Sequence, residues 1–153
     1  MAGGWAAGKT HALRHETLKP DLVWDGTLSK PVWAASMIEI ALHQGWQVEV
    51  VYIYRNLELA FYGAIERQKD EGRSVPLKEL PKVHRAVQQS ILELIPVYGR
   101  RSGVTFLFLH NLGKKGAMAD PLQIELKELE PYGALHYLDK HEHYYEKAAD
   151  HLG

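Results

Sequence analysis

The feature that most restricts the fold is a glycine-rich segment at residues 3–10, with the sequence Gly-Gly-Trp-Ala-Ala-Gly-Lys-Thr. It matches the pattern G-x-x-x-x-G-K-[ST] at every fixed position, and a stretch of helical pattern follows it, as a P-loop requires. Glycines at both ends let the backbone curl into a nest of N–H groups, and the following helix directs its positive N-terminus at a phosphate. The predicted phosphate-binding residues are Gly3, Gly4, Ala6, Ala7, Gly8, Lys9 and Thr10.

Two side chains of this segment and one carboxylate downstream predict phosphate and metal chemistry. In a P-loop the lysine contacts the β- and γ-phosphates and the hydroxyl binds magnesium, so we expect these roles for Lys9 and Thr10. Asp25 ends the short apolar run 21–25, where such proteins place a second acidic group on the magnesium side. The alternatives are an accidental Gly-Lys-Thr in a glycine-rich start and, for Asp25, an ordinary Asp-Gly turn.

The rest of the chain alternates between strand-like and helix-like patterns. This alternation predicts a parallel α/β sheet flanked by helices, of the P-loop NTPase type, with its first strand largely missing. We expect one nucleotide-binding domain over residues 1–113 and a helical appendage of the same unit over residues 114–153, helical in pattern from Pro121. The expected strands are 21–25, 48–54 and 104–109, all buried, and the expected helices cover 8–18, 31–44, 57–72 and 83–95, the last with an apolar stripe from Val83 to Ile95. Ser29 and Asn56 are expected to cap the second and third helices, and Gly45 to end the second.

Composition excludes several classes of partner. The chain has 18 Lys and Arg against 19 Asp and Glu, a formal net charge of −1, so no polybasic surface predicts binding to nucleic acid or an anionic membrane. It contains no cysteine, which excludes disulfides and thiol chemistry and is typical of a reducing compartment. Its apolar runs are far shorter than the roughly 20 residues of a membrane helix. We therefore expect a cytoplasmic protein with a nucleotide or small-molecule partner.

Arg67 and Arg73 flank Gly72, and a guanidinium beside a glycine hinge suits a mobile lid over phosphate. The alternative, of equal weight, is a solvated charged face. That face would also include Glu66, Lys69, Asp70 and Glu71.

The histidines and tryptophans do not predict a metal site or a base-binding site. His141 and His143 lie on different sides of an expected helix, about 200° apart at 3.6 residues per turn, although His136 and His143 could share a face. We interpret them as surface residues rather than metal ligands. Three of the four tryptophans are expected in the core and at its rim rather than in a base-stacking platform. They are Trp24, Trp33 and Trp46.

Taken together, these motifs resemble the zeta-toxin family of P-loop kinases, more closely its plasmid-borne relatives with a short spacer after the P-loop. The resemblance covers roughly residues 2–112. The Asp-Gly-Thr-Leu-Ser segment combined with two lid arginines is more specific than the P-loop itself. The segments that carry it are 2–10, 21–29, 45–55, 72–76 and the strand ending at Asn111.

The resemblance implies ATP binding and phosphoryl transfer to a hydroxyl, in the best-known members that of a UDP-activated amino sugar. It also implies an antitoxin or a larger plasmid-encoded protein as partner. Lys9 and Thr10 match the P-loop positions, with ATP and Mg²⁺ as the implied cofactors. Asp25 matches the acidic residue, Thr27 a threonine of the substrate side, Arg67 and Arg73 the arginines that grip ATP phosphates, and Asn111 joins the nucleotide-binding set.

Two departures from the family leave alternatives open. Between the P-loop helix and the acidic segment, residues 13–22 hold no counterpart of the aspartate that acts as general base in the toxins. Only Met1 and Ala2 precede the glycines, so we expect the chain to be truncated or to start late. The prediction is an ATP-dependent phosphotransferase with an unknown acceptor. The alternative is a non-catalytic nucleotide-binding or interaction module of a larger protein.

Overall fold

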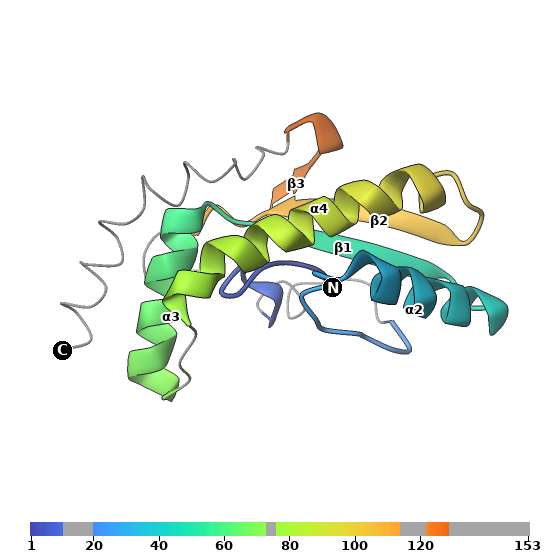
Figure 1. Ribbon diagram of the computed structural model, residues 1–153. Helices are drawn as coiled ribbons and strands as arrows, with labels where there is room; N and C mark the ends of the chain where they lie inside the picture. Colours follow the sequence, from blue (N-terminus) through green and yellow to red (C-terminus); the bar gives the residue numbers. More distant parts are fainter. Residues whose placement is uncertain (11–19, 73–75, 114–121, 129–153) are drawn as a thin grey trace.

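The computed structural model describes residues 1–10, 20–72, 76–113 and 122–128, and these form an α/β structure with helices packed on a sheet (Figure 1). Strand β1 (Val48–Tyr54) pairs in parallel with β2 (Val104–His110), and β2 pairs in antiparallel with β3 (Leu122–Ile124). The sheet is therefore mixed, in the order β1-β2-β3. The predicted α/β class is confirmed, and the arrangement is consistent with a P-loop NTPase-like fold.

Strand β1 is buried on both faces, as its run of β-branched and aromatic residues predicts. Successive side chains of a strand point to opposite faces. Val50, Tyr52 and Tyr54 accordingly pack into one hydrophobic cluster, while Val51 and Ile53 pack into another with Ala7 and Leu109. The strand that ends next to the P-loop is thus held in place by two cores.

Two helices cover one face of the sheet, and a third lies at its end. Helix α2 (Pro31–His43) and helix α4 (Leu80–Tyr98) run side by side across the face turned to the viewer in Figure 1. Helix α3 (Leu57–Glu71) follows the carboxyl end of β1 and contacts α4. The short 3₁₀ helices are η1 (Leu77–Glu79) and η2 (Leu126–Glu128).

Helix ends agree with the sequence prediction at three of four positions. The side chain of Asn56 accepts a hydrogen bond from the Glu58 N–H at 2.9 Å and so caps α3. Gly72 (φ 67°) follows α3 and Gly45 (φ 79°) follows α2, both left-handed as C-terminal glycines are. The expected cap at Ser29 is wrong, because α2 begins after Lys30, and the Ser29 hydroxyl instead lies 3.2 Å from that of Thr27.

Helix α4 buries a stripe at spacings of three and four residues, the period of an α-helix. Val83 and Ile95, which the apolar pattern places in this stripe, are only half-buried. The buried face instead includes a histidine, His84, that is 1% exposed. The apolar and aromatic members of the stripe are Leu80, Val87, Ile91, Leu94 and Tyr98.

Three element predictions are wrong. Residues 21–25 form no strand, and Leu22, Val23 and Trp24 are exposed. Within the described part of the chain, the backbone of this segment bonds to Met1, and one residue cannot sustain a ladder. Residues 122–124, expected to be helical, form β3, since the open edge of β2 offers backbone partners. Strand β2 is only half-buried. Most of the expected first helix and His136, His141 and His143 lie outside the described residues.

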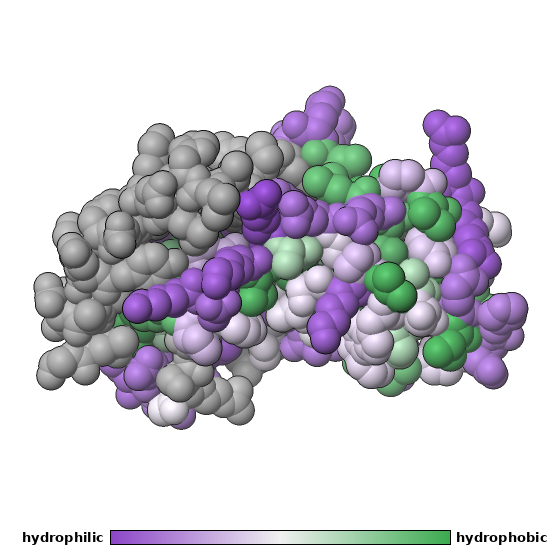
Figure 2. Space-filling model, in the orientation of Figure 1, coloured by the Kyte–Doolittle hydropathy of each residue, from purple (hydrophilic) through white to green (hydrophobic). Residues whose placement is uncertain are grey.

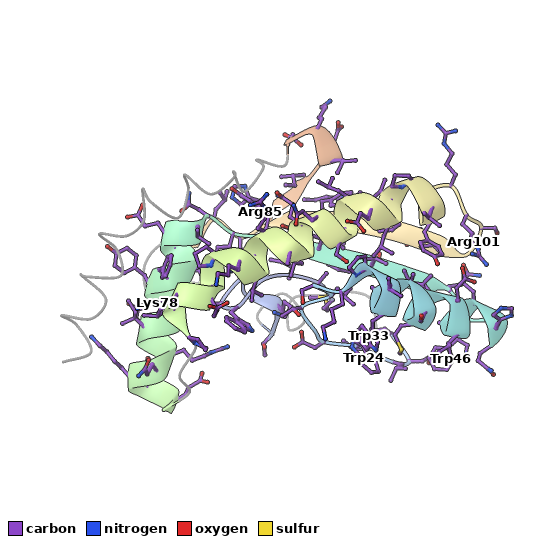
Figure 3. The ribbon with its side chains drawn as sticks, viewed as in Figure 1. Trp24, Trp33, Trp46, Lys78, Arg85 and Arg101 are labelled. Atoms are coloured by element: carbon purple, nitrogen blue, oxygen red, sulfur yellow. The ribbon has the colours of Figure 1, made fainter. Side chains whose placement is uncertain are left out.

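Three of the tryptophans lie at the surface, so their expected place in the core is wrong. Trp24, Trp33 and Trp46 are 49%, 40% and 47% exposed. Figure 3 shows Trp24 and Trp33 next to each other beside α2, and their ring centroids are 5.2 Å apart. Apolar side chains of α2 and α4 are also exposed, and Figure 2 shows hydrophobic residues scattered over this face of the molecule.

The buried histidine predicts a pH dependence of stability. The pKa of His84 is lowered from its ordinary 6.5 to about 4, chiefly by burial; a hydrogen bond to the Trp5 carbonyl opposes the shift, and the charges of Lys9 and Arg55 add to it. Because the unfolded chain takes up this proton more readily, the contribution of His84 to stability is complete above pH 6.5 and is lost as the pH falls to 4. The loss amounts to about 3 kcal/mol, at 1.36 kcal/mol per pKa unit.

Urea unfolding of the wild type and of His84→Gln between pH 4 and pH 7.5 measures this loss. The other histidines titrate in both proteins, so the difference between the two curves isolates His84. We expect the stability of the wild type to fall more steeply than that of the variant below pH 6.5. Parallel curves would contradict a buried neutral imidazole.

Candidate functional site

The P-loop begins between β1 and the segment that ends at Asp25. Ala2 donates its N–H to the Val51 carbonyl at 2.6 Å and accepts from the Ile53 N–H at 2.9 Å, a parallel pairing opposite Tyr52. On its other side, Met1 donates to the Trp24 carbonyl at 2.8 Å, and Gly26 donates to the Met1 carbonyl at 3.4 Å. These bonds bring Asp25 beside the start of the loop.

The backbone of the P-loop adopts conformations that explain its glycines. Gly3 and Gly8 have φ values of 154° and 97°, which favour glycine, and Ala6 has a φ of 57°. A Cβ on Gly3 would lie 3.0 Å from the Ile53 carbonyl oxygen, so a side chain there would also crowd the backbone of β1. Ala6 carries the conformational strain of a left-handed residue that is not glycine.

Three side chains from three separate elements hold the carbonyl groups of the loop. One lies at the end of β1, one follows β2, and one lies in α4, and all three residues are at most 3% exposed. Each donates to a different carbonyl, and the three carbonyls are consecutive. The bonds join Nε2 of His84 to Trp5 O (2.7 Å), Nη1 of Arg55 to Ala6 O (2.8 Å) and Nδ2 of Asn111 to Ala7 O (2.9 Å).

These bonds decide which way the amide groups of the loop point. In a trans peptide the C=O and the following N–H lie on opposite sides. With the carbonyls of Trp5 and Ala7 turned into the protein, the N–H groups of Ala6 and Gly8 face the opposite side, and the Ala7 N–H closes a turn onto Gly4 O at 3.3 Å. The loop therefore has the form of an anion-binding nest.

Lys9 lies over this nest. Its ammonium donates to the carbonyls of Gly3 and Gly4 at 3.1 and 3.2 Å. Burial lowers the pKa of Lys9, the carboxylate of Asp25 raises it, and the guanidinium of Arg67 lowers it. The structure thus brings Asp25 and Arg67 close enough to Lys9 to act electrostatically on its ammonium.

Of the two arginines of the expected lid, the structure describes Arg67. The Nε of Arg67 lies 3.6 Å from a carboxylate oxygen of Glu71, a helical i,i+4 ion pair, and its side chain is 36% exposed. The ion pair of Arg67 with Glu71 is typical of a solvated helix face. The effect of Arg67 on the pKa of Lys9 instead favours a guanidinium that faces the phosphate site. Gly72 ends α3 in the left-handed conformation, and Arg73 lies outside the described residues.

The remaining expected site residues lie around the loop. Thr10 has helical backbone and is exposed, and Asp25 is exposed as well. Thr27 belongs to a loop in which Leu28 has a φ of 54°, a strained value that also seats Leu28 against the core. Asn111 bonds both to the P-loop and, through Oδ1, to the Gly113 N–H at 3.0 Å, so its described contacts position backbone.

Sequence reasoning did not identify Arg55, His84 and Gly63 as residues that shape the site. Arg55 directly follows a strand of apolar residues and His84 interrupts an apolar stripe, and both are places where a buried polar side chain needs a specific partner. Gly63 lies in the middle of α3, where a glycine costs about 1 kcal/mol relative to alanine. A Cβ there would lie 2.9 Å from Nη1 of Arg55, so the glycine leaves room for the guanidinium.

Oxygen donors suited to a hard cation lie at this site. The carboxylate of Asp25 and the hydroxyl of Thr10 are the ligand types that magnesium takes alongside substrate phosphates. Among the described residues, no group of three His, Cys, Asp or Glu side chains is arranged to hold a metal ion by itself. Over the same residues, no helix has the length and apolar character to cross a membrane.

Comparison with known protein families matches residues 16–108, more than half of the chain, to the family described as Zeta toxin. The P-loop lies just before the matched range. A search of curated proteins found no match. Zeta toxins use ATP and are P-loop kinase-like proteins of toxin–antitoxin systems. With the matched residues spanning the acidic segment, β1, α3, α4 and most of β2, this chain belongs to the zeta toxin family.

Proposed function

We propose that this protein transfers the γ-phosphoryl group of ATP to a hydroxyl acceptor. The observation that carries the proposal is the P-loop whose carbonyls are held by His84, Arg55 and Asn111, so that its amides face the side on which an anion would lie. Phosphoryl transfer needs positioning and charge stabilisation more than covalent chemistry from the protein. A preorganised loop with an ammonium above it supplies both.

Lys9 is the central cation of the proposed reaction. Its ammonium would exchange the carbonyls of Gly3 and Gly4 for the β- and γ-phosphate oxygens of ATP. Thr10 and Asp25 would hold the magnesium ion, which neutralises charge on the phosphates. The remaining loop residues form the phosphate site with their backbone, in which the Ala6 and Gly8 amides would bind phosphate and the Ala7 amide closes the turn. They are Gly3, Gly4, Ala6, Ala7 and Gly8.

The other proposed roles rest on the family resemblance and on charge. Arg67 and Arg73 stabilise the transferring phosphoryl group, and Asn111 contributes to the nucleotide site by holding the loop. Thr27 lies on the acceptor side, close to Asp25 in the sequence. A hydroxyl of a UDP-activated amino sugar is the acceptor that the resemblance suggests. An antitoxin is the protein partner suggested by the family.

A non-catalytic nucleotide-binding module is the second candidate. The observation that favours it is the spacer at residues 13–22, which holds no counterpart of the general-base aspartate of the toxins. Without a base to accept the proton of the hydroxyl, the loop would still bind nucleotide. Turnover of ATP separates the two functions.

The first test is ATP binding by Lys9→Ala. Hydrogen bonds between charged groups contribute about 1.5–3 kcal/mol, so we expect affinity for ATP·Mg²⁺ to fall by about 10- to 100-fold. Titration with a fluorescent ATP analogue measures it. Lys127→Ala, which removes a lysine with a side chain 78% exposed, is the control and should bind as the wild type does. Equal affinity of the wild type and Lys9→Ala would refute the phosphate role.

The second test separates a magnesium role of Asp25 from a folding role. Asp25→Asn keeps the size of the side chain but removes the charge, so we expect affinity to fall about tenfold with Mg²⁺ and little in EDTA. Asp21→Asn, an exposed residue of the same segment, is the matched control. An equal loss in the presence and absence of the metal would place Asp25 in the folding of the loop.

The third test addresses catalysis. Contacts that strengthen in the transition state change turnover more than binding, so Arg67→Ala and Arg73→Ala should reduce single-turnover ATP consumption at least tenfold while changing ATP affinity less. If the forked geometry of the Arg73 guanidinium matters, Arg73→Lys should lose most of the turnover that Arg73→Ala loses. Arg100→Ala, exposed after α4, is the control. Wild-type turnover in both alanine variants would assign the arginines to a solvated face. Absence of wild-type turnover would favour the non-catalytic module.

A further inference from the structure

We infer that His84 of α4 sets the shape of the P-loop and that Gly4 is its matched steric partner. His84 is a positioning residue: it holds a peptide group of the loop, whose amides then bind the nucleotide phosphates. The inference rests on the proposed function for its ligand. It extends that function to a side chain 74 residues beyond the end of the motif.

The hydrogen bond between His84 and Trp5 defines the state of the imidazole. Nε2 lies 2.7 Å from the carbonyl oxygen of Trp5, which can only accept, so Nε2 carries the proton and donates. Burial keeps the ring neutral at physiological pH. The histidine therefore orients the loop without placing a second positive charge beside Lys9.

Gly4 is a glycine because the ring of His84 occupies the space beside it. The P-loop pattern leaves this position open to any residue. The φ of Gly4 is not left-handed, so its backbone conformation alone would admit alanine. A Cβ on Gly4 would overlap the Cγ, Cδ2 and Nε2 atoms of the His84 ring, far closer than side chains approach one another. Gly4 and His84 thus fit only as a pair.

The pair couples the loop to the rigid part of the fold. Helix α4 is anchored to the sheet through Val87, Ile91 and Leu94, which belong to the main hydrophobic cluster. His84 lies on the same buried face, one turn before Val87. The Trp5 carbonyl is held by this helix, and the Ala6 N–H, on the other side of the same peptide, is turned toward the phosphate side. A shifted imidazole would therefore misdirect an amide that the proposed ligand needs.

A double-mutant cycle on ATP affinity tests this pairing. Gly4→Ala should lower the affinity at least tenfold when residue 84 is histidine, because the new Cβ displaces the ring. In the His84→Ala background, where the ring is gone, the same change should cost less than threefold. His84→Ala alone should lower affinity about tenfold, and His84→Gln, which keeps a donor near the Nε2 position, should recover most of it.

Leu94→Ala is the matched control for lost stability. It removes a buried side chain of the same helix that belongs to the main cluster, so it should lower the melting temperature while leaving ATP affinity unchanged. An affinity loss in Leu94→Ala as large as in His84→Ala would overturn the inference, because helix destabilisation would explain both. Additive effects of Gly4→Ala and His84→Ala would overturn it as well.

Amide hydrogen exchange separates a failure of this inference from a failure of the proposed function. If the wild type binds no ATP, the proposed function fails, and exchange at Ala6 to Gly8 still decides the role of His84. The inference expects these amides to exchange at least tenfold faster in His84→Ala than in Leu94→Ala, relative to the global exchange of each variant. Equal exchange would overturn it. ATP binding with an unchanged affinity in His84→Ala would overturn the inference alone.

Discussion

The structure depends on how the carbonyl groups of the P-loop are satisfied. A loop that presents its N–H groups to a phosphate must turn its C=O groups the other way, into the protein, where an unmade hydrogen bond costs about 1–3 kcal/mol. Buried donors meet this demand here, and each comes from a different element. Arg55, His84 and Asn111 converge on three consecutive carbonyls, so the loop keeps its form only if β1, β2 and α4 are in place.

The surrounding fold is arranged around these donors. The two-sided burial of β1 fixes the end of the strand, and hence Arg55, while Gly63 in α3 leaves room for the guanidinium at the cost of a weaker helix. Helix α4 buries the imidazole of His84 on its core-facing side, and the P-loop carbonyl of Trp5 accepts a hydrogen bond from it. Trp5 and Ala6 in turn pack against the cluster formed by α3 and the start of α4. Loop, helices and sheet therefore stabilise one another.

The charges of the site balance in a way that suits an anionic ligand. Lys9 is half-buried, its charge opposed by burial and by Arg67 and supported by Asp25. Bringing a triphosphate to the loop would stabilise this ammonium, and a magnesium ion beside Asp25 would screen the carboxylate. Arg55 is a further buried cation behind the loop, stabilised by Glu66. Neutral His84 holds the loop without adding to this charge.

The sequence by itself determined the class of fold and carries the prediction of the kind of site. The pattern at residues 3–10 predicts a phosphate loop, the apolar run at 48–54 predicts a strand buried on both faces, and Asn56 and Gly72 mark the ends of α3, because these features depend on neighbours along the chain. The strand prediction at residues 21–25 is wrong because it depends on partners from elsewhere in the chain. A strand needs backbone partners, and only the tertiary structure shows that, among the residues it describes, this segment pairs with the single residue Met1.

Only the tertiary structure decided which side chains build the loop. Asn111 was expected to serve the nucleotide, and its described contacts are with the backbone of Ala7 and Gly113. His84 and Arg55 lie 79 and 49 residues from the carbonyls that they bind, a separation that no local pattern encodes. Gly4 stands at an open position of the motif, and its need for glycine appears only when the imidazole of His84 is seen against it. The physical reason is that steric exclusion and hydrogen bonding act through space, between elements that packing alone brings together.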